Sequence, residues 1–456
     1  MAAAVARGSD WVSPRQVDAL SASFSEAPSV ADRRREAYER FLALPLEPNP
    51  LYRGYGYFTN VDLTGLDPLS PGAGVGLPPP RADEVRITHD AAGTHVELAP
   101  SLRDGGVKVA SFGTGPSGPP PAEEATDRLA ALSAALVNRG YLLEVPPSVR
   151  SPVRVRDLTI LSRPHEALSV RRLLRAGAGT QLLLIEEVYS APGNAEAQRF
   201  HASDTDLDLD ANAKAVVLTV HAPDRRAVSV YRRSSVTGPR SRIAWLWAGL
   251  GGYRTKARNS SRLVGQGSVV DDLQFFYGAG DQSYDSSVHL THVGTDTHGQ
   301  SITRGVFTDR ARGMSRGLVR IEKDAAKTLS FISEHAMLLS RGARSDTIPI
   351  LEILCRDVKA THSTSVHPVD PEQVFYLESR GFDEPQAVRM IGEGFLSYVL
   401  ERAPIASLRE VLYPALEARW NGEELPWTAD GARALPELHV TGTEGAPEWR
   451  FDTKLR

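Results

Sequence analysis

Short apolar runs separated by turn-forming residues dominate the middle of the chain, from about residue 145 to 368. Runs such as TQLLLIEEVYS (180–190), AKAVVLTVHA (213–222) and AVSVYRRSSV (227–236) are rich in β-branched residues and are bounded by Gly, Asn, Asp, Pro or Ser. This rhythm predicts strands and turns, with no helix longer than a turn or two between them. More than 200 residues of strands without an exact repeat predict a large sandwich, a propeller or a β-solenoid.

Polar residues at alternate positions are compatible with the solenoid among these three folds. They are frequent in TKARNSSRLVGQGSVVDDLQFF (255–276) and in THVGTDTHGQSITRGVFTDRARGMSRGLVRI (291–321). Each coil of a solenoid can turn its outer side chains to solvent, so such strands fit that fold. A solenoid also needs capped ends, and both flanks of this region have helical patterns.

The two flanks differ from the strand-rich middle in their periodicity. Before it, Tyr38, Phe41 and Leu42 have helical spacing, and residues 123–140 predict a helix closed by Gly140. After it, Val388, Ile391, Phe395 and Val399 line one face of a predicted helix. We therefore expect four parts: an N-terminal helical region with Pro/Gly-rich linkers (1–144), a β-solenoid core (145–368), a C-terminal helical region (369–420) and a polar tail (421–456).

Composition and charge exclude several classes of protein. The chain has 456 residues, 41% hydrophobic and 24% charged, as expected of a soluble globular protein. A net charge of −4 argues against a nucleic-acid binder, which needs clustered positive charge. One cysteine excludes an internal disulfide framework and fits a reducing compartment. The start, MAAAVARGSDWVSPR, has no apolar segment typical of a signal peptide, and no apolar run reaches the ~18 residues of a membrane helix. We expect a soluble, cytoplasmic protein.

Nucleotide-binding motifs are weak or missing. GTGPSG (113–118) matches the dinucleotide pattern, but prolines follow it where a helix should begin, so we interpret it as a linker. No Gly-Lys dipeptide occurs in the chain, which excludes a Walker A loop. We therefore expect no ATP hydrolysis by this chain alone.

The stretch LEILCRDVKATHSTSVHP (351–368) contains the only cysteine, Cys355, together with His362 and His367. A thiol seven residues before an imidazole is compatible with half of a metal site. Because Leu351, Ile353 and Cys355 alternate in phase, a small buried thiol is the competing interpretation, and it is the one that we favour.

Other candidate groups have simpler interpretations. A zinc or iron site needs about three converging ligands, and His292, His298, His335, His362 and His367 are each more simply solvated or singly hydrogen-bonded. The acid doublets Glu186–Glu187 and Asp271–Asp272 cannot form a glycosidase pair, since neighbours on a strand point to opposite faces. We predict that both doublets lie at solvated edges.

Four segments resemble the SufB/SufD family, the scaffold proteins of the SUF iron–sulfur cluster assembly system. They are EEVYSAPG (186–193), MSRGLVRIEKDAAKTLSFISEHAMLLSRGARSDTIPILEI (314–353), HSTSV (362–366) and DPEQVFYLESRGFDEPQAVRMIGEGF (370–395). The resemblance implies a right-handed parallel β-helix between helical termini. It also implies that two such chains pair at their last coils and that the ATPase SufC docks on the C-terminal helices, whose apolar residues include Phe375, Ile391, Phe395 and Val399.

Residue by residue, the chain is closer to the SufD type than to the SufB type. Ala343 stands where SufB-type chains carry a cysteine thought to hold the nascent cluster, and Ser363 replaces their glutamate after the histidine of HSTSV. Other SufB-type positions are replaced by Val220, His221, Ala222 and Arg232, and a cysteine of some SufD chains by Ala360. His362 matches the histidine that SufD-type chains contribute to the cluster site, whereas Cys355 matches no family cysteine.

The resemblance therefore implies a non-catalytic scaffold that binds a SufC-like ATPase and a SufB-like chain or a second copy of itself. His362 is the implied ligand of a transient iron–sulfur cluster at the subunit interface, and the thiolate would come from the partner. Two alternatives stay open: a diverged protein of the same fold, recruited as a metal-dependent enzyme using His292, His298 and His362, and a β-solenoid acting on carbohydrate.

Overall fold

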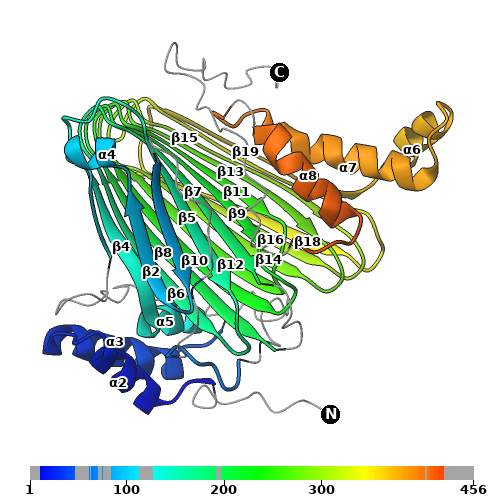
Figure 1. Cartoon of the computed structure of the whole chain (residues 1–456). Coiled ribbons are helices and arrows are strands. Elements are labelled where there is room, and N and C mark those ends of the chain that lie inside the picture. Colours follow the sequence, from blue (N-terminus) through cyan, green and yellow to red (C-terminus); the bar gives the residue numbers. More distant parts are fainter. Residues whose placement is uncertain are drawn as a thin grey trace.

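The computed structural model describes residues 11–46, 61, 63–69, 74, 84–111, 127–191, 197–405 and 408–425. Within them the chain forms a β-solenoid with helices at its N-terminal and C-terminal ends (Figure 1). The GTGPSG segment and the tail beyond Leu425 lie outside the described residues. The predicted fold class is confirmed.

Successive strands of the solenoid alternate between two sheets. β5, β7, β9, β11, β13, β15, β17 and β19 are neighbours in one sheet, and β4, β6, β8, β10, β12, β14, β16 and β18 in the other. All neighbours within these two series are parallel, so each turn of the solenoid adds one strand to each sheet, giving about eight turns. The bounds are β4 Val137–Val145, β5 Val153–Leu161, β6 Ala167–Ala176, β7 Gln181–Ser190, β8 Arg199–Leu209, β9 Lys214–Ala222, β10 Ala227–Thr237, β11 Arg242–Gly249, β12 Arg254–Leu263, β13 Val269–Gly278, β14 Ser283–His292, β15 His298–Phe307, β16 Arg312–Ile321, β17 Thr328–Leu338, β18 Arg344–Ile353 and β19 Val358–Pro368.

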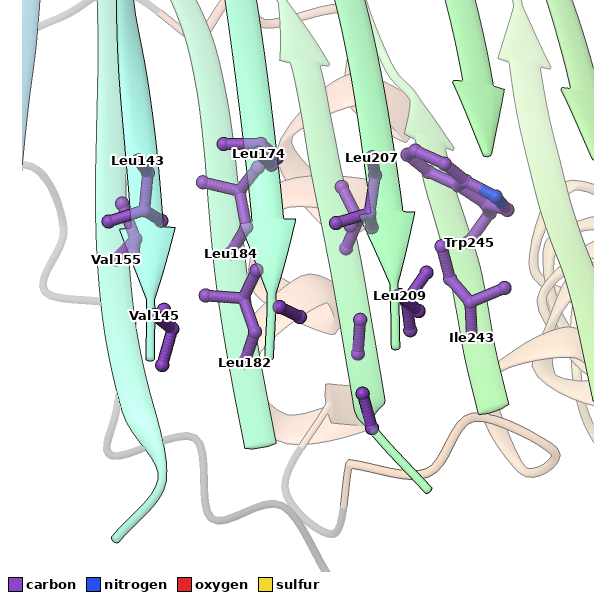
Figure 2. Close-up of a cluster of buried hydrophobic side chains, with 14 of the residues drawn as sticks. Leu143, Val145, Val155, Leu174, Leu182, Leu184, Leu207, Leu209, Ile243 and Trp245 are labelled. Carbon is purple, nitrogen blue, oxygen red and sulfur yellow. The ribbon is translucent and has the colours of Figure 1, made fainter. Parts of the chain in front are cut away.

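Aliphatic side chains stack between the two sheets. Leu143, Leu174 and Leu207 are register partners on successive strands of one sheet, and Val155 and Leu184 are register partners in the other. All five are at most 1% exposed, and they belong to one continuous cluster (Figure 2). Each fully buried leucine of this kind contributes roughly 1.5–3 kcal/mol, so the ladder is a main source of the solenoid's stability.

The turns also stack from one coil to the next, and some leave no room for a side chain. A Cβ on Gly265 would overlap the backbone of Gly238, which occupies the equivalent turn of the preceding coil. Asn212 and Asp296 occupy turns with positive φ, a conformation that asparagine and aspartate tolerate. Glycine and short polar residues therefore recur between the strands.

An N-terminal unit covers the first coil and part of one sheet. Its strands β1 Glu84–Asp90, β2 Gly93–Leu98 and β3 Lys108–Ser111 extend the two sheets, and α4 Pro100–Asp104 lies between β2 and β3. The helices α2 Pro14–Ser23, α3 Pro28–Ala43 and α5 Arg128–Ala135 pack together, and their apolar cluster includes Phe200 and Val230 on the outer face of the solenoid. Pro28 occupies the first turn of α3, where its missing N–H costs nothing.

The C-terminal helices divide into a packed pair and a projecting helix. The packed pair is α7 Glu384–Leu400 and α8 Leu408–Trp420. Their Leu396, Leu412 and Leu416 form one cluster with Phe275 of β13 and Ile302 of β15. α6 Pro371–Glu378 has no buried residue and projects away from the solenoid (Figure 1).

The helix predicted for residues 123–140 is wrong at its C-terminal end. α5 ends at Ala135, and residues from Val137 onward form β4 and pair with β6. Gly140 lies inside that strand, with a φ of 152°, and closes no helix. Sheet pairing overrides the helical propensity of this segment because it satisfies the backbone of an otherwise unpaired strand.

Membrane insertion through a helix finds no support in the described residues. None of their helices combines the length and the apolar character that crossing a bilayer requires.

Candidate functional site

The solenoid ends at an open last coil made of β18 and β19. These are the terminal strands of the two sheets, and their outer edges pair with no other described strand. Large apolar side chains are exposed here: Ile353 at 43%, Leu354 at 56% and Val366 at 39%. Unpaired edges with exposed apolar side chains are typical of an interface with another chain.

His362 lies in the middle of β19, and its register partner on β17 is the buried Ile332. The row continues through register partners along the inside of the solenoid: Val155, Leu184, Val217, Trp245, Asp272, Ser301, Ile332 and His362. His362 therefore has the orientation of a core residue, but it is exposed because no further coil covers it.

The imidazole of His362 is available for a ligand. The structure gives it no hydrogen bond to any described residue, and its strand neighbour Ala360 packs against the end of the hydrophobic core. Among the described residues, no group of three or more His, Cys, Asp or Glu side chains could hold a metal ion. A metal centre at His362 therefore needs further ligands from outside the described part of this chain.

The neighbouring histidines lie on the opposite face of the last coils. His335 on β17 contacts Ser365 through Nδ1 (2.5 Å) and Ser363 through Nε2 (3.2 Å), and burial with nearby Arg304 lowers its pKa to about 4. His367 packs edge-on against Phe395 of α7, with ring centroids 6.1 Å apart. Neither joins His362 in a common site.

The structure does not bring His292, His298 and His362 together as a three-histidine metal site. His292 is fully buried, and both ring nitrogens are used, Nδ1 with Thr297 (2.8 Å) and Nε2 with Ser330 (3.1 Å). Burial lowers the pKa of His292 to about 3, so it stays neutral. The expectation of a solvated or singly hydrogen-bonded histidine is wrong for this residue and for His335, which also uses both ring nitrogens.

Cys355 lies in the turn between β18 and β19 and not on the strand that its alternation with Leu351 and Ile353 predicts. The side chain is partly buried and packs against the end of the hydrophobic core. It contributes to no metal-binding group among the described residues.

Both acid doublets are buried, so the prediction of solvated edges is wrong. Glu186 points into the solenoid and Glu187 outward, where Arg156 donates to it at 2.7 Å. Asp272 points inward and accepts from Gln274 (2.5 Å), whereas Asp271 accepts from Gln300 (2.6 Å). The members of each doublet do point to opposite faces.

A charged network inside the solenoid explains why Glu186 can be buried. Arg172 donates to both oxygens of Asp157, at 2.6 and 2.8 Å, and its Nη1 lies 3.2 Å from Glu186. Arg233 reaches the second oxygen of Glu186 at 3.3 Å. Burial alone would raise the pKa of Asp157 and of Glu186, but the guanidinium groups outweigh it and hold both below their ordinary values.

This network could not be recognised from single residues. Asp157 is in phase with Val153 and Val155, which face the core, and that phase was the available signal. Its polarity suggests solvent, yet both faces of these strands are largely covered.

The four predicted partner-binding residues occupy different environments. Val399 is 2% exposed, and Ile391 and Phe395 are partly buried; all three pack in the cluster that joins α7 and α8 to the solenoid. Phe375 on α6 is 71% exposed. Three further exposed apolar side chains lie nearby in the sequence: Tyr376 on α6, Phe382 between α6 and α7, and Met390 on α7. The apolar face of α7 is therefore largely used within the chain, and α6 carries the available surface.

Comparisons with known proteins agree on one family. The model described as "SUF system FeS cluster assembly, SufBD core domain" matches residues 159–395. The iron–sulfur cluster assembly protein SufD of Bacillus subtilis is 29% identical over 353 residues, which cover 73% of this chain and 78% of that protein. An iron–sulfur cluster assembly SufBD family protein of Synechocystis is 25% identical over 284 residues, covering 60% of this chain and 59% of that protein. A chloroplastic SufBD family protein of Arabidopsis thaliana is 24% identical over 283 residues, 60% of this chain and 50% of that protein.

Proposed function

Because the chain belongs to the SufBD family of the SUF iron–sulfur cluster assembly system, we propose that it is a non-catalytic, SufD-type scaffold subunit. In this role it binds a SufB-type chain and a SufC-type ATPase. The observation that carries the proposal is the position of His362, an inward-facing imidazole exposed at the open end of the solenoid without companion ligands among the described residues.

His362 acts in this proposal as one ligand of a cluster assembled between two chains. A neutral imidazole can bind iron, and the remaining ligands, including thiolates, come from the partner. The cluster is cargo that is built and handed on, so the chain needs no complete ligand set of its own.

The open edges of β18 and β19 are the proposed contact with the SufB-type chain. A strand at a sheet edge offers unpaired N–H and C=O groups, and the exposed Ile353, Leu354 and Val366 add apolar area. A second copy of this chain offers the same edges, so a homodimer is the competing assembly.

Substitution at the edge tests this contact. Val366→Lys places a charge within the proposed interface and should weaken association with a co-expressed SufB-type chain at least tenfold. Val264→Lys is the matched control, because Val264 is equally exposed (41%) but lies in a turn between β12 and β13. Equal association of both variants would place the interface elsewhere.

The function itself is tested by co-expression with SufB-type and SufC-type chains followed by size-exclusion chromatography. A stable complex containing all three chains supports the scaffold role. Failure of the wild-type chain to enter any such complex would contradict it.

A further inference from the structure

A basic groove lies on the outer face of the sheet that contains β10, β12, β14 and β16, beside the start of α5. Its volume is about 540 Å³, within the range of small-molecule sites. The residues that give it its character are Arg232, Lys256, Arg258, Arg262, His289 and Arg316. Asp127 is the one carboxylate among the described lining residues.

The parallel register explains why the cations converge. Arg232 pairs with Arg258, Arg258 with Ser287, and Ser287 with Arg316, so three arginines share one row across four adjacent strands. Neighbouring strands are about 4.8 Å apart, which puts successive side chains of such a row within reach of one ligand. On β12, Lys256, Arg258 and Arg262 share the outward face because they differ by even numbers of residues.

Two of these arginines form ion pairs with buried carboxylates. Asp204 is 1% exposed and lies 2.5 Å from Nη2 of Arg232, while Asp285, 2% exposed, pairs with Arg316. Arg232 also pairs with Asp206, at 2.9 Å. A guanidinium has five N–H donors, so these pairings leave others for a ligand. Nε of Arg232 is a buried donor with no hydrogen-bond partner among the described residues.

His289 orients the central arginine. Its Nδ1 lies 3.4 Å from Nη2 of Arg258 and its Nε2 lies 3.0 Å from Oγ of Ser287. A guanidinium can only donate, so Nδ1 accepts and Nε2 carries the proton that goes to Ser287. Burial, together with Arg258 and Arg316, lowers the pKa of His289 to about 4, which agrees with this neutral tautomer.

The other wall of the groove suits an organic group. Leu318 and Ile350 line it on β16 and β18, and Ile350 is 39% exposed. The hydroxyls of Ser234, Ser260 and Thr291 also line the groove. The groove thus combines guanidinium groups, hydroxyl groups and an apolar surface within a limited volume.

From this arrangement we propose that the groove binds a soluble organic phosphate, with its phosphate at Arg232, Arg258 and Arg316 and its organic part against Leu318 and Ile350. Planar guanidinium groups match phosphate oxygens in two-pronged hydrogen bonds, and hydroxyls supply further donors. The groove lies on the outer face of its sheet, whereas His362 faces the inside of the solenoid, so the proposal does not rest on the role proposed for His362.

Isothermal titration of the full chain at low salt, with ADP and inorganic pyrophosphate as probes and adenosine as the uncharged control, tests the proposal. We expect both phosphates to bind and adenosine alone not to bind detectably. Arg258→Gln should weaken ADP binding at least tenfold. Arg320→Gln is the matched control, since Arg320 lies on the same face of β16 but outside the groove lining and pairs with Glu322.

Circular dichroism and the thermal midpoint verify that both variants are folded. If Arg258→Gln does not fold, Arg262→Gln replaces it, because Arg262 also lines the groove and is exposed. No binding of either phosphate at millimolar concentration would overturn the proposal. So would equal weakening by Arg320→Gln, which would indicate diffuse charge attraction. Binding only to anionic lipid vesicles, and not to the soluble probes, would also contradict it.

Discussion

At the scale of single residues, Arg172 neutralises two carboxylates in the interior of the solenoid. It is fully buried and joins two carboxylates, Asp157 and Glu186, that have no access to water. Buried charges are tolerated when they are paired and hydrogen-bonded, but removing one partner leaves the others uncompensated.

Arg172→Met should therefore destabilise the protein by about 3–5 kcal/mol, because two buried carboxylates lose their main counter-charge. Arg175→Met is the control on the same strand: Arg175 pairs with Glu144 but is 65% exposed, and its loss should stay within about 0.5 kcal/mol. Urea unfolding followed by circular dichroism measures both. A small effect of Arg172→Met would mean that the interior is more hydrated than the burial indicates.

A second residue, Asp271, gives the stability a pH dependence. Burial raises its pKa to about 8, against an ordinary value near 4 in the unfolded chain. Between these values the folded state keeps a proton that the unfolded state has lost. The contribution of Asp271 is therefore favourable near pH 4, declines as the pH rises, and is lost above about pH 8.

Asp271→Asn should raise the free energy of unfolding at pH 8.5 by at least about 1 kcal/mol, because the amide keeps the acceptor for Gln300 without a buried charge. At pH 4 the difference from wild type should largely vanish. Thermal melts across pH 4–9 measure this, with Asp324→Asn, at an exposed position, as the control. A variant that is less stable at pH 8.5 would refute the assignment.

Sequence patterns locate some of these residues better than others. The inward orientation of His362 could be predicted from its alternation with Val358 and Ala360. Asp157, Glu186 and Asp271 could not be placed correctly, because alternation shows which residues share a face but not whether that face is covered. In this solenoid the opposite sheet covers the inward face of each strand, and helices cover parts of the outward face.

At the scale of elements, α6 and α7 serve different purposes although both have apolar residues. Leu396 of α7 is fully buried against the solenoid, whereas Phe375 of α6 is exposed. Deleting everything after residue 370 would therefore uncover the outer face of a sheet as well as remove the proposed docking surface. Single substitutions separate the two effects.

Leu396→Ala should cost about 2–4 kcal/mol of stability, since it creates a cavity in a packed core. Phe375→Ala should change stability by no more than about 0.5 kcal/mol but weaken binding of the SufC-type ATPase, because exposed aromatic side chains are frequent interface anchors. Surface plasmon resonance with the immobilised ATPase, together with thermal melts, measures both quantities. Unchanged ATPase affinity in Phe375→Ala would remove α6 from the proposed interface.

Most strands could be predicted from their composition, but the boundaries of elements could not. GLVRIEKDAAKTLSFIS (317–333) reads as one run, yet it contains the end of β16, a turn and the start of β17. The turn includes Lys327 with a φ of 59°, which its sequence does not signal. Likewise Val137–Gly140 reads as helix, and pairing with β6 makes it a strand.

At the scale of the whole molecule, the two sheets of the solenoid are partly covered by helices, and one end of the solenoid is open. The N-terminal strands β1 to β3 extend the first coil, and helices cover parts of both outer faces (Figure 1). The last coil exposes two edges and His362. The helical flanks predicted caps at both ends, but α7 and α8 pack on the outer face of a sheet and leave the last coil open. Only the family resemblance, which implies pairing of two chains at their last coils, indicated an exposed end. Periodicity alone left a sandwich and a propeller open, because all three folds use the same strand rhythm.

The most direct test of the account is the iron and sulfide content of the complex with SufB-type and SufC-type chains, reconstituted anaerobically. His362→Ala should assemble the complex normally, since an exposed imidazole adds little to packing, but should lose most of the bound iron and acid-labile sulfide. Cys355→Ala should retain both at the wild-type level. Loss of the cluster in Cys355→Ala with retention in His362→Ala would contradict the account, because the thiol and not the imidazole would then be the ligand that this chain supplies.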